Sequence, residues 1–517
     1  MLSTRGSRRT DGRLAEIVPR RMRSTAAVIV AIGVLLSACT LNPSVPTPTP
    51  TPAITGGTLR VAVAADVASL DPWSDEASLV AIRQIFETLV EVDPATSKVT
   101  PALASSWQTA NDGATWTFTL REGVRFHDGS ALDAAAVAAS FDRGRTTRAY
   151  RALFGDASTV QSVQAVDPRT VRFDLRVPFG PFLAHLGAPQ AAIARGTAGT
   201  GPFVAPTGAL APDGGLTLRR NDAYWARDAA GRQLPYLTGL VLRPVLDPTS
   251  RLAELRAGRV EVALDLPIPQ ASTARSDPSL AVSPRKDAAL ASLGINTTAT
   301  PFDRSEARRA LAMAINRNAL SAVYGGTSRP ATQAAPPRSM AYDDSVVEFA
   351  PLDVDGARKA LVDAHIPTPI SVELAYPNVP TDAYPDPLRI AQSIAADLGK
   401  IGIVARLRAV DPAALREAGA TLTLDTTALG LDPDDVFWPL YGLDDPTGTS
   451  LIVGLVRKAR AEADPTKRAE LYKQVSKIAR TDALRVPLLF ADRPHATTAR
   501  LVGYGGIEYF GTVWLRP

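Results

Sequence analysis

Short stretches of alternating apolar and polar residues predict strands along this chain. Residues 115–120 alternate Thr with Trp, Phe and Leu, and residues 171–175 place Val, Phe and Leu on either side of charged residues. Residues 403–408 alternate Ile, Ala and Leu with Val and Arg. Successive side chains of a strand point to opposite faces of its sheet, so all three stretches are predicted as half-buried strands.

Other stretches have the spacing of one-sided helices. Asp303 and Glu306 are spaced as a capping box, and the apolar residues that follow them share one helical face. A second helix is predicted from about Leu388 to Ile401, with Gly402 placed to end it. Strands and helices mixed in this way predict an α/β protein, and the length predicts about three domains or subdomains because a single core does not grow so large.

The first part of the chain has a different pattern. Residues 1–23 contain seven Arg, two acidic residues and no Lys, and an apolar run follows from Ala26 to Leu36. This run is shorter than the roughly 17–25 apolar residues that cross a bilayer. A basic head before a short apolar stretch is typical of a secretory signal.

The end of the apolar run carries the only Cys of the chain. Leu36-Ser37-Ala38-Cys39 resembles a bacterial lipobox, in which the Cys thiol is lipidated and becomes the mature N-terminus. The alternative is a chance Cys behind an ordinary signal peptide. We expect residues 1–38 to be the signal peptide and residues 39–55, rich in Pro and Thr, to be an extended linker.

Removal of residues 1–38 changes the charge of the protein. The intact chain has a formal charge of +4, and seven Arg against Asp11 and Glu16 give the removed segment +5, so the mature chain carries about −1. The basic isoelectric point therefore belongs mostly to the signal segment. Net charge gives no argument for nucleic-acid binding.

A series of motifs after residue 55 resembles one family. The most specific is the run from Asp112 to Arg143, DGATWTFTLREGVRFHDGSALDAAAVAASFDR. Within it, Gly123 and Gly129 suit turns, and Asp133 can cap the helix that follows. The other matching segments are residues 56–61, 69–72, 86–90, 100–107, 199–203, 220–225 and 293–317. Their order resembles the family 5 extracellular solute-binding proteins of ABC importers, which bind oligopeptides, dipeptides or nickel chelates.

The resemblance implies a periplasmic-binding-protein-like fold of two lobes with a hinge. Lobe 1 would comprise residues 56–282, with an extra subdomain at about 96–200, and the C-terminal return at 487–517. Lobe 2 would comprise residues 283–486. The ligand would lie between the lobes, and hinge closure would bury it.

The resemblance also places a candidate ligand site on residues 429–438. Peptide-binding members hold the ligand ammonium with an Asp just before a DPDNF-like loop, and in ungapped register that position is Leu429. This departure counts against recognition of a free-amine peptide, unless Asp425 or Asp432 takes the role. Asp432, Asp434 and Asp435 are candidate ligand contacts, and the alternative is that they form a solvated turn.

Five further residues are candidate ligand contacts. Trp438 and Tyr441 follow the loop and either wall the pocket or belong to the core. Trp73 and Glu76 match a region that often approaches the ligand in the family, and Glu76 would face either a cation or water. Asn296 lies on a stretch whose backbone can pair with an extended ligand, or is a structural turn amide.

No cofactor, metal site or catalytic residue is expected. His127, His185, His365 and His495 are scattered, and none forms a pair with metal-ligand spacing. The chain lacks Gly-x-Ser-x-Gly, His-Glu-x-x-His and the phosphate-binding Gly-x-x-x-x-Gly-Lys motif. A carboxylate pair in the cleft, as glycosidases use, is the enzyme alternative that stays open.

We therefore expect a lipid-anchored, extracytoplasmic solute-binding protein on the periplasmic or outer face of the membrane. It would act as a monomer that delivers a small, peptide-like ligand to an ABC permease and ATPase complex, without nucleic acid. A sensing or adhesion lipoprotein of the same fold is the main alternative, and adjacent permease and ATPase genes would favour transport.

Overall fold

The computed structural model describes residues 53–74, 78–155, 159–346, 349–442 and 450–517. Residues 53–517 form one compact unit. The expected signal peptide, Cys39 and most of the Pro/Thr-rich linker lie outside the described residues. Within the described part of the chain, no helix combines the length and the apolar character needed to cross a membrane.

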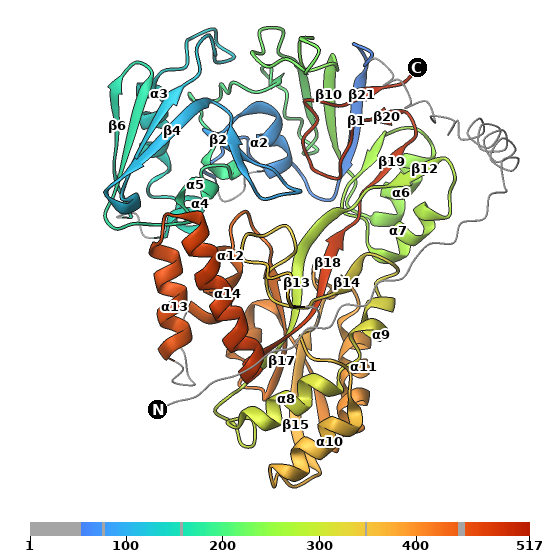
Figure 1. Cartoon of the computed structure of the whole chain (residues 1–517). Helices are drawn as coiled ribbons and strands as arrows, with labels where there is room; N and C mark the ends of the chain where they lie inside the picture. The colour runs from blue at the N-terminus through green and yellow to red at the C-terminus, as the bar shows by residue number, and fades with distance from the viewer. Residues whose placement is uncertain (1–52, 75–77, 156–158, 347–348, 443–449) are drawn as a thin grey trace, which may run out of the picture. The chain divides into compact units, whose positions relative to one another are not determined.

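The first lobe is built on a mixed seven-stranded sheet (Figure 1). Its order is β12-β19-β11-β1-β10-β9-β8, in which β1 runs parallel to β10 and β11. The strands are β1 (Thr58–Val63), β8 (Phe203–Val204), β9 (Leu216–Arg220), β10 (Gly239–Pro244), β11 (Val262–Ala263), β12 (Leu280–Val282) and β19 (Ala496–Thr498). Helices α2 (Leu79–Ile85), α6 (Pro248–Arg256) and α7 (Ile268–Arg275) belong to the same lobe. The C-terminal strands β20 (Leu501–Val502) and β21 (Trp514–Leu515) also return to it, because Phe510, Val513 and Leu515 pack in its core.

A four-stranded antiparallel sheet forms a subdomain of this lobe. Its order is β4-β5-β7-β6, with β4 (Ala104–Ala110), β5 (Thr115–Leu120), β6 (Val160–Asp167) and β7 (Thr170–Leu175). The strands predicted at 115–120 and 171–175 are thus confirmed. Helix α3 (Ala134–Gly144) begins at the predicted cap, since the Asp133 carboxylate accepts the Ala136 N–H at 2.8 Å. The remaining elements here are β2 (Val90–Val92), β3 (Val99–Pro101), α4 (Arg148–Phe154) and α5 (Phe182–His185).

The second lobe is built on a six-stranded sheet with helices on both faces. The order β14-β18-β13-β17-β15-β16 places the long strand β13 in the middle. The strands are β13 (Arg285–Ile295), β14 (Ser328–Pro330), β15 (Ile370–Pro377), β16 (Ile403–Val410), β17 (Leu422–Ala428) and β18 (Arg485–Arg493). The helices are α8 (Ser305–Ala314), α9 (Arg317–Ala322), α10 (Val354–Asp363), α11 (Pro387–Gly399), α12 (Asp434–Phe437), α13 (Ser450–Ala461) and α14 (Pro465–Asp482).

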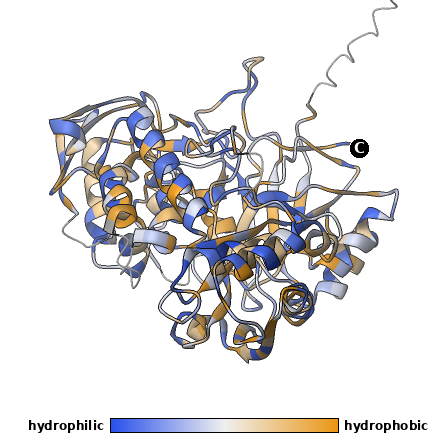
Figure 2. Cartoon of the chain, turned by 60° about the horizontal axis from the view of Figure 1, so that its bottom comes forward, coloured by the Kyte–Doolittle hydropathy of each residue, from blue (hydrophilic) through white to orange (hydrophobic). Residues whose placement is uncertain are grey.

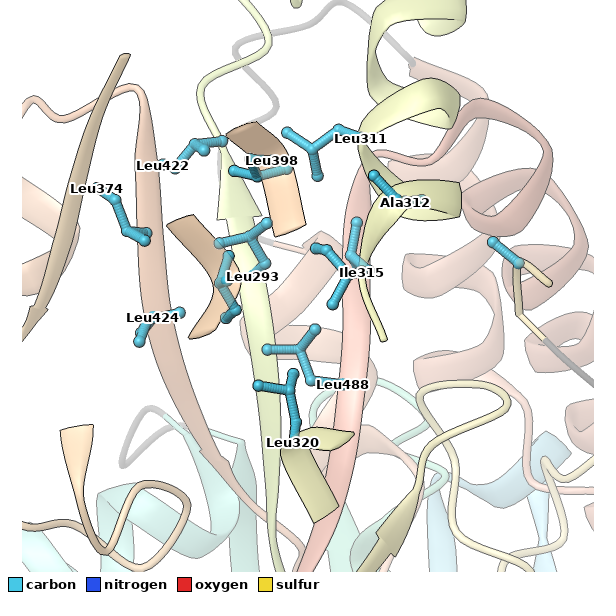
Figure 3. Packing of buried hydrophobic residues seen from close by; sticks show 14 of the residues in the cluster. Leu293, Leu311, Ala312, Ile315, Leu320, Leu374, Leu398, Leu422, Leu424 and Leu488 are labelled. Carbon is cyan, nitrogen blue, oxygen red and sulfur yellow. The ribbon is translucent and has the colours of Figure 1, made fainter. Parts of the chain in front are cut away.

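The two faces of the six-stranded sheet bury separate apolar cores. Leu311 and Ile315 pack with Leu293 of β13 on one face (Figure 3). Leu290 of the same strand lies on the other face with Tyr472 of α14. A strand buried on both faces reads as a nearly continuous run of apolar and small residues, as residues 288–295 of β13 do. The helices are one-sided, and Figure 2 shows hydrophobic and hydrophilic residues side by side along them.

Two of the helix predictions have different outcomes. Helix α11 and the strand β16 after Gly402 lie close to where they were predicted, but the helix ends at Gly399, and Gly402, with φ +80°, lies in the turn that leads to β16. The capping box at Asp303 is wrong. The N-cap of α8 is Arg304, without a side-chain cap, because Asp303 belongs to the preceding turn, where its N–H bonds to the Ala299 carbonyl.

The chain crosses between the lobes at two adjacent places. Strand β12 leads through residues 283–284 into β13, and β18 leads through residues 494–495 into β19. The paired strands are antiparallel on both sides of the crossing, because β13 pairs with β18 and β12 pairs with β19. Two adjacent connections of this kind define one bending axis, which is the geometry of a hinge. The domain boundary predicted at residue 486 falls inside β18.

Candidate functional site

The acidic loop after β17 folds back on itself. The Asp432 carboxylate accepts the Asp434 N–H at 2.8 Å, and the Asp435 carboxylate accepts the Asp432 N–H at 3.0 Å. These bonds order the turn before helix α12, whose N-cap is Pro433 without a side-chain cap, and the helix continues into a π-helical turn, η4 (Trp438–Gly442). An Asp that bonds a backbone N–H two residues ahead is a common way to begin such a turn. The loop is therefore ordered by its own carboxylates.

Asp432 forms a buried ion pair with Arg468 of α14. Both carboxylate oxygens accept from the guanidinium, one of them at 2.6 Å from Nη1, and both side chains are no more than 3% exposed. Burial alone lowers the pKa of Arg468, but Asp432, together with Tyr472 and Asp434, more than offsets this, so the pKa lies above its ordinary value. Asp432 is thus committed to holding α14 against the loop rather than to an exposed turn.

Asp434 lies in the same buried cluster. Its carboxylate contacts Arg460 at 3.3 Å and accepts the Tyr472 hydroxyl at 3.2 Å. Burial raises the pKa of Asp434 to about 6, against the opposing effect of Arg460. The Arg460 guanidinium also lies 4.0 Å from the centroid of the Trp438 ring, a cation–π contact that fixes this partly buried indole.

Asp435 reaches across to the first lobe. Its carboxylate contacts Nε2 of His185, at the end of α5, at 3.0 Å. Nδ1 of the same ring contacts the Leu153 carbonyl at 2.5 Å. A carboxylate and a carbonyl both only accept, so both ring nitrogens must donate and His185 is an imidazolium in this arrangement.

The pKa values agree with this protonation state. Burial lowers the pKa of His185, but the charge and hydrogen bond of Asp435, with the charges of Asp432 and Asp434, raise it above the ordinary value. Burial raises the pKa of Asp435, but His185 and backbone donors lower it further than burial raises it. The pair is therefore a charged link between the two lobes.

Backbone contacts beside this link join the same two lobes. The Gly180 N–H donates to the Arg460 carbonyl at 2.7 Å, and Nη1 of Arg468 donates to the Gly180 carbonyl at 3.2 Å. A Cβ atom added at Gly180 would lie 2.3 Å from the Glu462 carbonyl oxygen. This close approach requires a residue without a side chain.

A cavity of about 40 Å³ lies beside the acidic loop, between the two lobes. By the measure of about 10–15 Å³ for one water, it holds a few waters. Its lining comes from lobe 1 and from two loops of lobe 2: Ser97, Val99 and Ala184; Ala335, Pro336, Arg338, Ser339 and Met340; and Leu429–Pro433, Val436 and Phe437. Leu429, at the position where peptide-binding members hold the ammonium, is 3% exposed and packs in an apolar cluster.

The other predicted residues lie in different surroundings. Trp73 is 2% exposed and packs edge-on against Phe141 in the core of the first lobe. Asn296 closes a turn by accepting the Thr298 N–H at 3.1 Å. Asp425, the alternative ammonium ligand, is buried and bonded to Arg485. Glu76 lies outside the described residues.

The structure thus gathers only one part of the predicted set. Asp432, Asp434, Asp435, Trp438 and Tyr441 lie together, with Tyr441 buried against Phe437 at a ring distance of 6.2 Å. Arg468, Arg460, His185 and Arg338 complete this region and were not identified from the sequence. They come from segments far apart in the chain and belong to no motif, so no local pattern marks them.

One cluster at the hinge has donor types that a metal could use. Polar atoms of Asp265, His495 and Glu508 lie within 4.8 Å of one another. The donor set does not fit a metal, because Nδ1 of His495 accepts the Asp265 N–H at 3.1 Å and the ring proton therefore sits on Nε2, which faces Glu508. Arg493 also lies 3.5 Å from the Asp265 carboxylate.

Comparisons with known proteins identify the family. The family model for bacterial extracellular solute-binding proteins, family 5, matches residues 98–450. The glutathione-binding protein GsiB of Salmonella paratyphi A is 28% identical over 490 residues, which cover 88% of this chain and 93% of that protein.

Two solved structures share the fold over most of the chain. HbpA2 from Haemophilus parasuis is 25% identical with a TM-score of 0.78, over 89% of this chain and 100% of that one. The periplasmic binding protein DppA from Helicobacter pylori, in complex with the peptide STSA, is 26% identical with a TM-score of 0.67, over 89% and 98% of the two chains. A two-lobed α/β structure with a double crossing and a family model that covers most of the chain lead to one conclusion: this protein belongs to the family 5 bacterial extracellular solute-binding proteins.

Proposed function

We propose that this protein captures a small, peptide-like solute between its two lobes and delivers it, as a monomer, to an ABC permease and ATPase complex. The observation that carries the proposal is a cavity whose lining comes from both lobes, in a structure whose chain crosses twice between these lobes. Side chains from two bodies that meet on one cavity can sense a ligand by closing on it.

The size of the cavity supports a binding cycle with an open state. About 40 Å³ is far below the roughly 300–1,000 Å³ of ordinary ligand pockets. The lobes would separate about the residues 283–284 and 494–495, admit the solute and close again. The names of the relatives support the ligand class, since they include a glutathione-binding protein and a protein solved with a four-residue peptide.

A ligand screen tests the proposal. We expect members of a set of short peptides, glutathione, haem and nickel chelates to raise the melting temperature of the mature protein. Small-angle scattering should then show a smaller radius of gyration with the stabilising solute than without it. A solute that binds without any change in the radius would contradict capture by closure.

We further propose that the mature protein is held at the extracytoplasmic face of the membrane by a lipid on Cys39. The basic head, the short apolar run and the lipobox-like residues 36–39 support this anchor. Cys39→Ser should release the protein into the soluble fraction while its melting temperature stays unchanged. Membrane attachment of the Ser variant that survives a carbonate wash would refute the anchor.

A further inference from the structure

Arg338 is the cationic side chain in the lining of the interlobe cavity. Its side chain is 15% exposed, and its guanidinium donates to the Ser97 hydroxyl at 3.0 Å and toward the carbonyls of Leu429 and Gly430 at 3.4 and 3.3 Å. Ser97 belongs to the first lobe and the two carbonyls to the second. All three partners are neutral, so none of them balances the charge of the guanidinium.

The nearest ion pair of Arg338 is weak and shared. Among the described residues, Asp287 is the carboxylate found within 4.0 Å of the guanidinium, at 4.0 Å from Nε. The other oxygen of Asp287 accepts from Arg329 at 2.5 Å. Burial lowers the pKa of Arg338, Asp287 and Asp435 partly oppose this, and the nearby Arg285 and Arg329 add to the lowering. An arginine stays charged in proteins, and its nearest carboxylate is shared with Arg329, so the positive charge of Arg338 is only partly balanced.

The rest of the lining offers no free anion. Asp432 lines the cavity, but both of its oxygens are bonded to Arg468. Leu429 contributes an apolar surface where a carboxylate would be needed for an ammonium. A partly buried cation without a matching anion is costly unless a ligand supplies the opposite charge.

We infer that Arg338 binds an acidic group of the ligand, a carboxylate in the simplest case, and that the solute needs no free ammonium at this end of the cleft. This inference rests on the proposed function and specifies its ligand class. The guanidinium presents two donors in a plane, which match the two oxygens of a carboxylate. The Ser97 hydroxyl would donate to the same group from the other lobe, so that the acid would also stabilise closure.

The test compares one set of tripeptides in three forms: free, N-acetylated and C-amidated. Affinity is measured by calorimetry and by the shift in melting temperature. The wild type should bind the free and acetylated acids about tenfold or more tightly than the amides. Acetylation should change affinity little, and a loss above about tenfold on acetylation would overturn the statement about the ammonium.

Variants assign the effect to the guanidinium. Arg338→Met should lose the preference for acids over amides, and Arg338→Lys should keep part of it, because it retains the charge but not the fork. Lys286→Met is the matched control. It removes a nearby positive charge that is 71% exposed and paired with Asp492, outside the cavity lining, and it should leave the preference intact.

Each result decides between the two proposals. Equal binding of acids and amides by the wild type, or an acid preference that survives in Arg338→Met, would overturn the role of Arg338 while peptide capture stands. If the Met variant does not fold, the preference of the wild type for acids over amides decides.

If no tripeptide binds, the peptide-like ligand class fails, and succinate and acetate then test Arg338 alone. Stabilisation of the wild type but not of Arg338→Met by these acids supports the inference, and its absence overturns it.

Discussion

At the scale of single residues, the buried pair of Asp432 and Arg468 shows what holds the candidate site in place. Arg468 bonds Asp432, the Ala459 carbonyl and the Gly180 carbonyl, so one side chain links the acidic loop, the last turn of α13 and the first lobe. A buried pair adds little net stability compared with apolar residues of the same size, but removing one partner leaves a buried charge without compensation.

Arg468→Met should therefore lower the free energy of unfolding by about 3–5 kcal/mol, measured by urea denaturation. The double variant Arg468→Met with Asp432→Leu should recover part of this loss, since neither charge remains but the Asp434 N–H loses its acceptor. Lys359→Met is the control, because it breaks an exposed pair with Asp363 that should contribute about 0.5 kcal/mol or less. A double variant as unstable as the single one would show that the pair contributes more than charge compensation.

The same residues show where sequence reasoning ends. The acidic loop was found from its resemblance to the DPDNF-like loop of the family. Its turn between β17 and α12 follows from hydrogen bonds among its own residues. The partners of its carboxylates lie 36 residues away at Arg468 and 250 residues away at His185. No periodicity or spacing connects such segments, so the alternative of a solvated turn could be judged only once the fold was known.

At the scale of elements, local sequence patterns predicted the helices and strands whose formation depends on neighbouring residues. Strands β5 and β7 and helices α3 and α11 follow from alternation, helical spacing and caps, because each is a choice that a few neighbouring residues make. The predicted start of α8 was wrong because the turn after Ala299 and the first turn of the helix both lie within residues 299–306. The side chain of Asp303 alone does not decide between them.

The contact between elements at Gly180 gives a prediction of its own. Gly180→Ala should weaken closure, because its Cβ would press on the Glu462 carbonyl and on Arg468 only when the lobes meet. Single-molecule FRET can report this, with labels at Val166→Cys and Val362→Cys, both exposed, in a Cys39→Ser background free of other thiols. The closed fraction should fall in the Ala variant.

Gly454→Ala is the matched control on α13. It lies on the helix that leads to the same contact, and an added Cβ there meets nothing within 4 Å. This change should leave the closed fraction unchanged and raise stability by roughly 0.5–1 kcal/mol, as expected for Gly to Ala inside a helix. An unchanged closed fraction in Gly180→Ala as well would mean that the lobes meet less closely in solution.

At the scale of the whole molecule, closure brings together a histidine from one lobe and three carboxylates from the other. His185 contacts the Asp435 carboxylate and the Leu153 carbonyl, its ring lies 5.8 Å from Phe179, and Asp432 and Asp434 add negative charge nearby. Arg460 and Arg468 oppose this charge from α13 and α14. Separation of the lobes removes Asp435 from the ring, so closure and protonation of His185 are thermodynamically linked.

The direction of the pH dependence follows from the two pKa shifts. Closure raises the pKa of His185. The free energy by which His185 favours the closed form is therefore fully present below the ordinary pKa of about 6.5, and it is lost as pH rises through the higher pKa of the closed form. Closure lowers the pKa of Asp435. The free energy by which Asp435 favours the closed form is therefore fully present above the ordinary pKa of about 3.9, and it is lost as pH falls through the lower pKa of the closed form. The charged pair of His185 and Asp435 is therefore fully formed between these two pH limits.

The same FRET pair measures this linkage directly. We expect the closed fraction of the ligand-free protein to be highest at mildly acidic pH, to fall as the medium becomes alkaline and to fall again in strong acid. His185→Gln keeps an N–H donor group and cannot be charged, so its closed fraction should be lower at mildly acidic pH and should lose the alkaline step. Asp434, with its pKa of about 6, titrates within the mildly acidic range in which the closed fraction is highest. The variant Asp434→Asn separates the effect of this titration on closure from that of His185. An alkaline step of full size in His185→Gln would assign the pH dependence to another group and leave the interlobe pair without a role in closure.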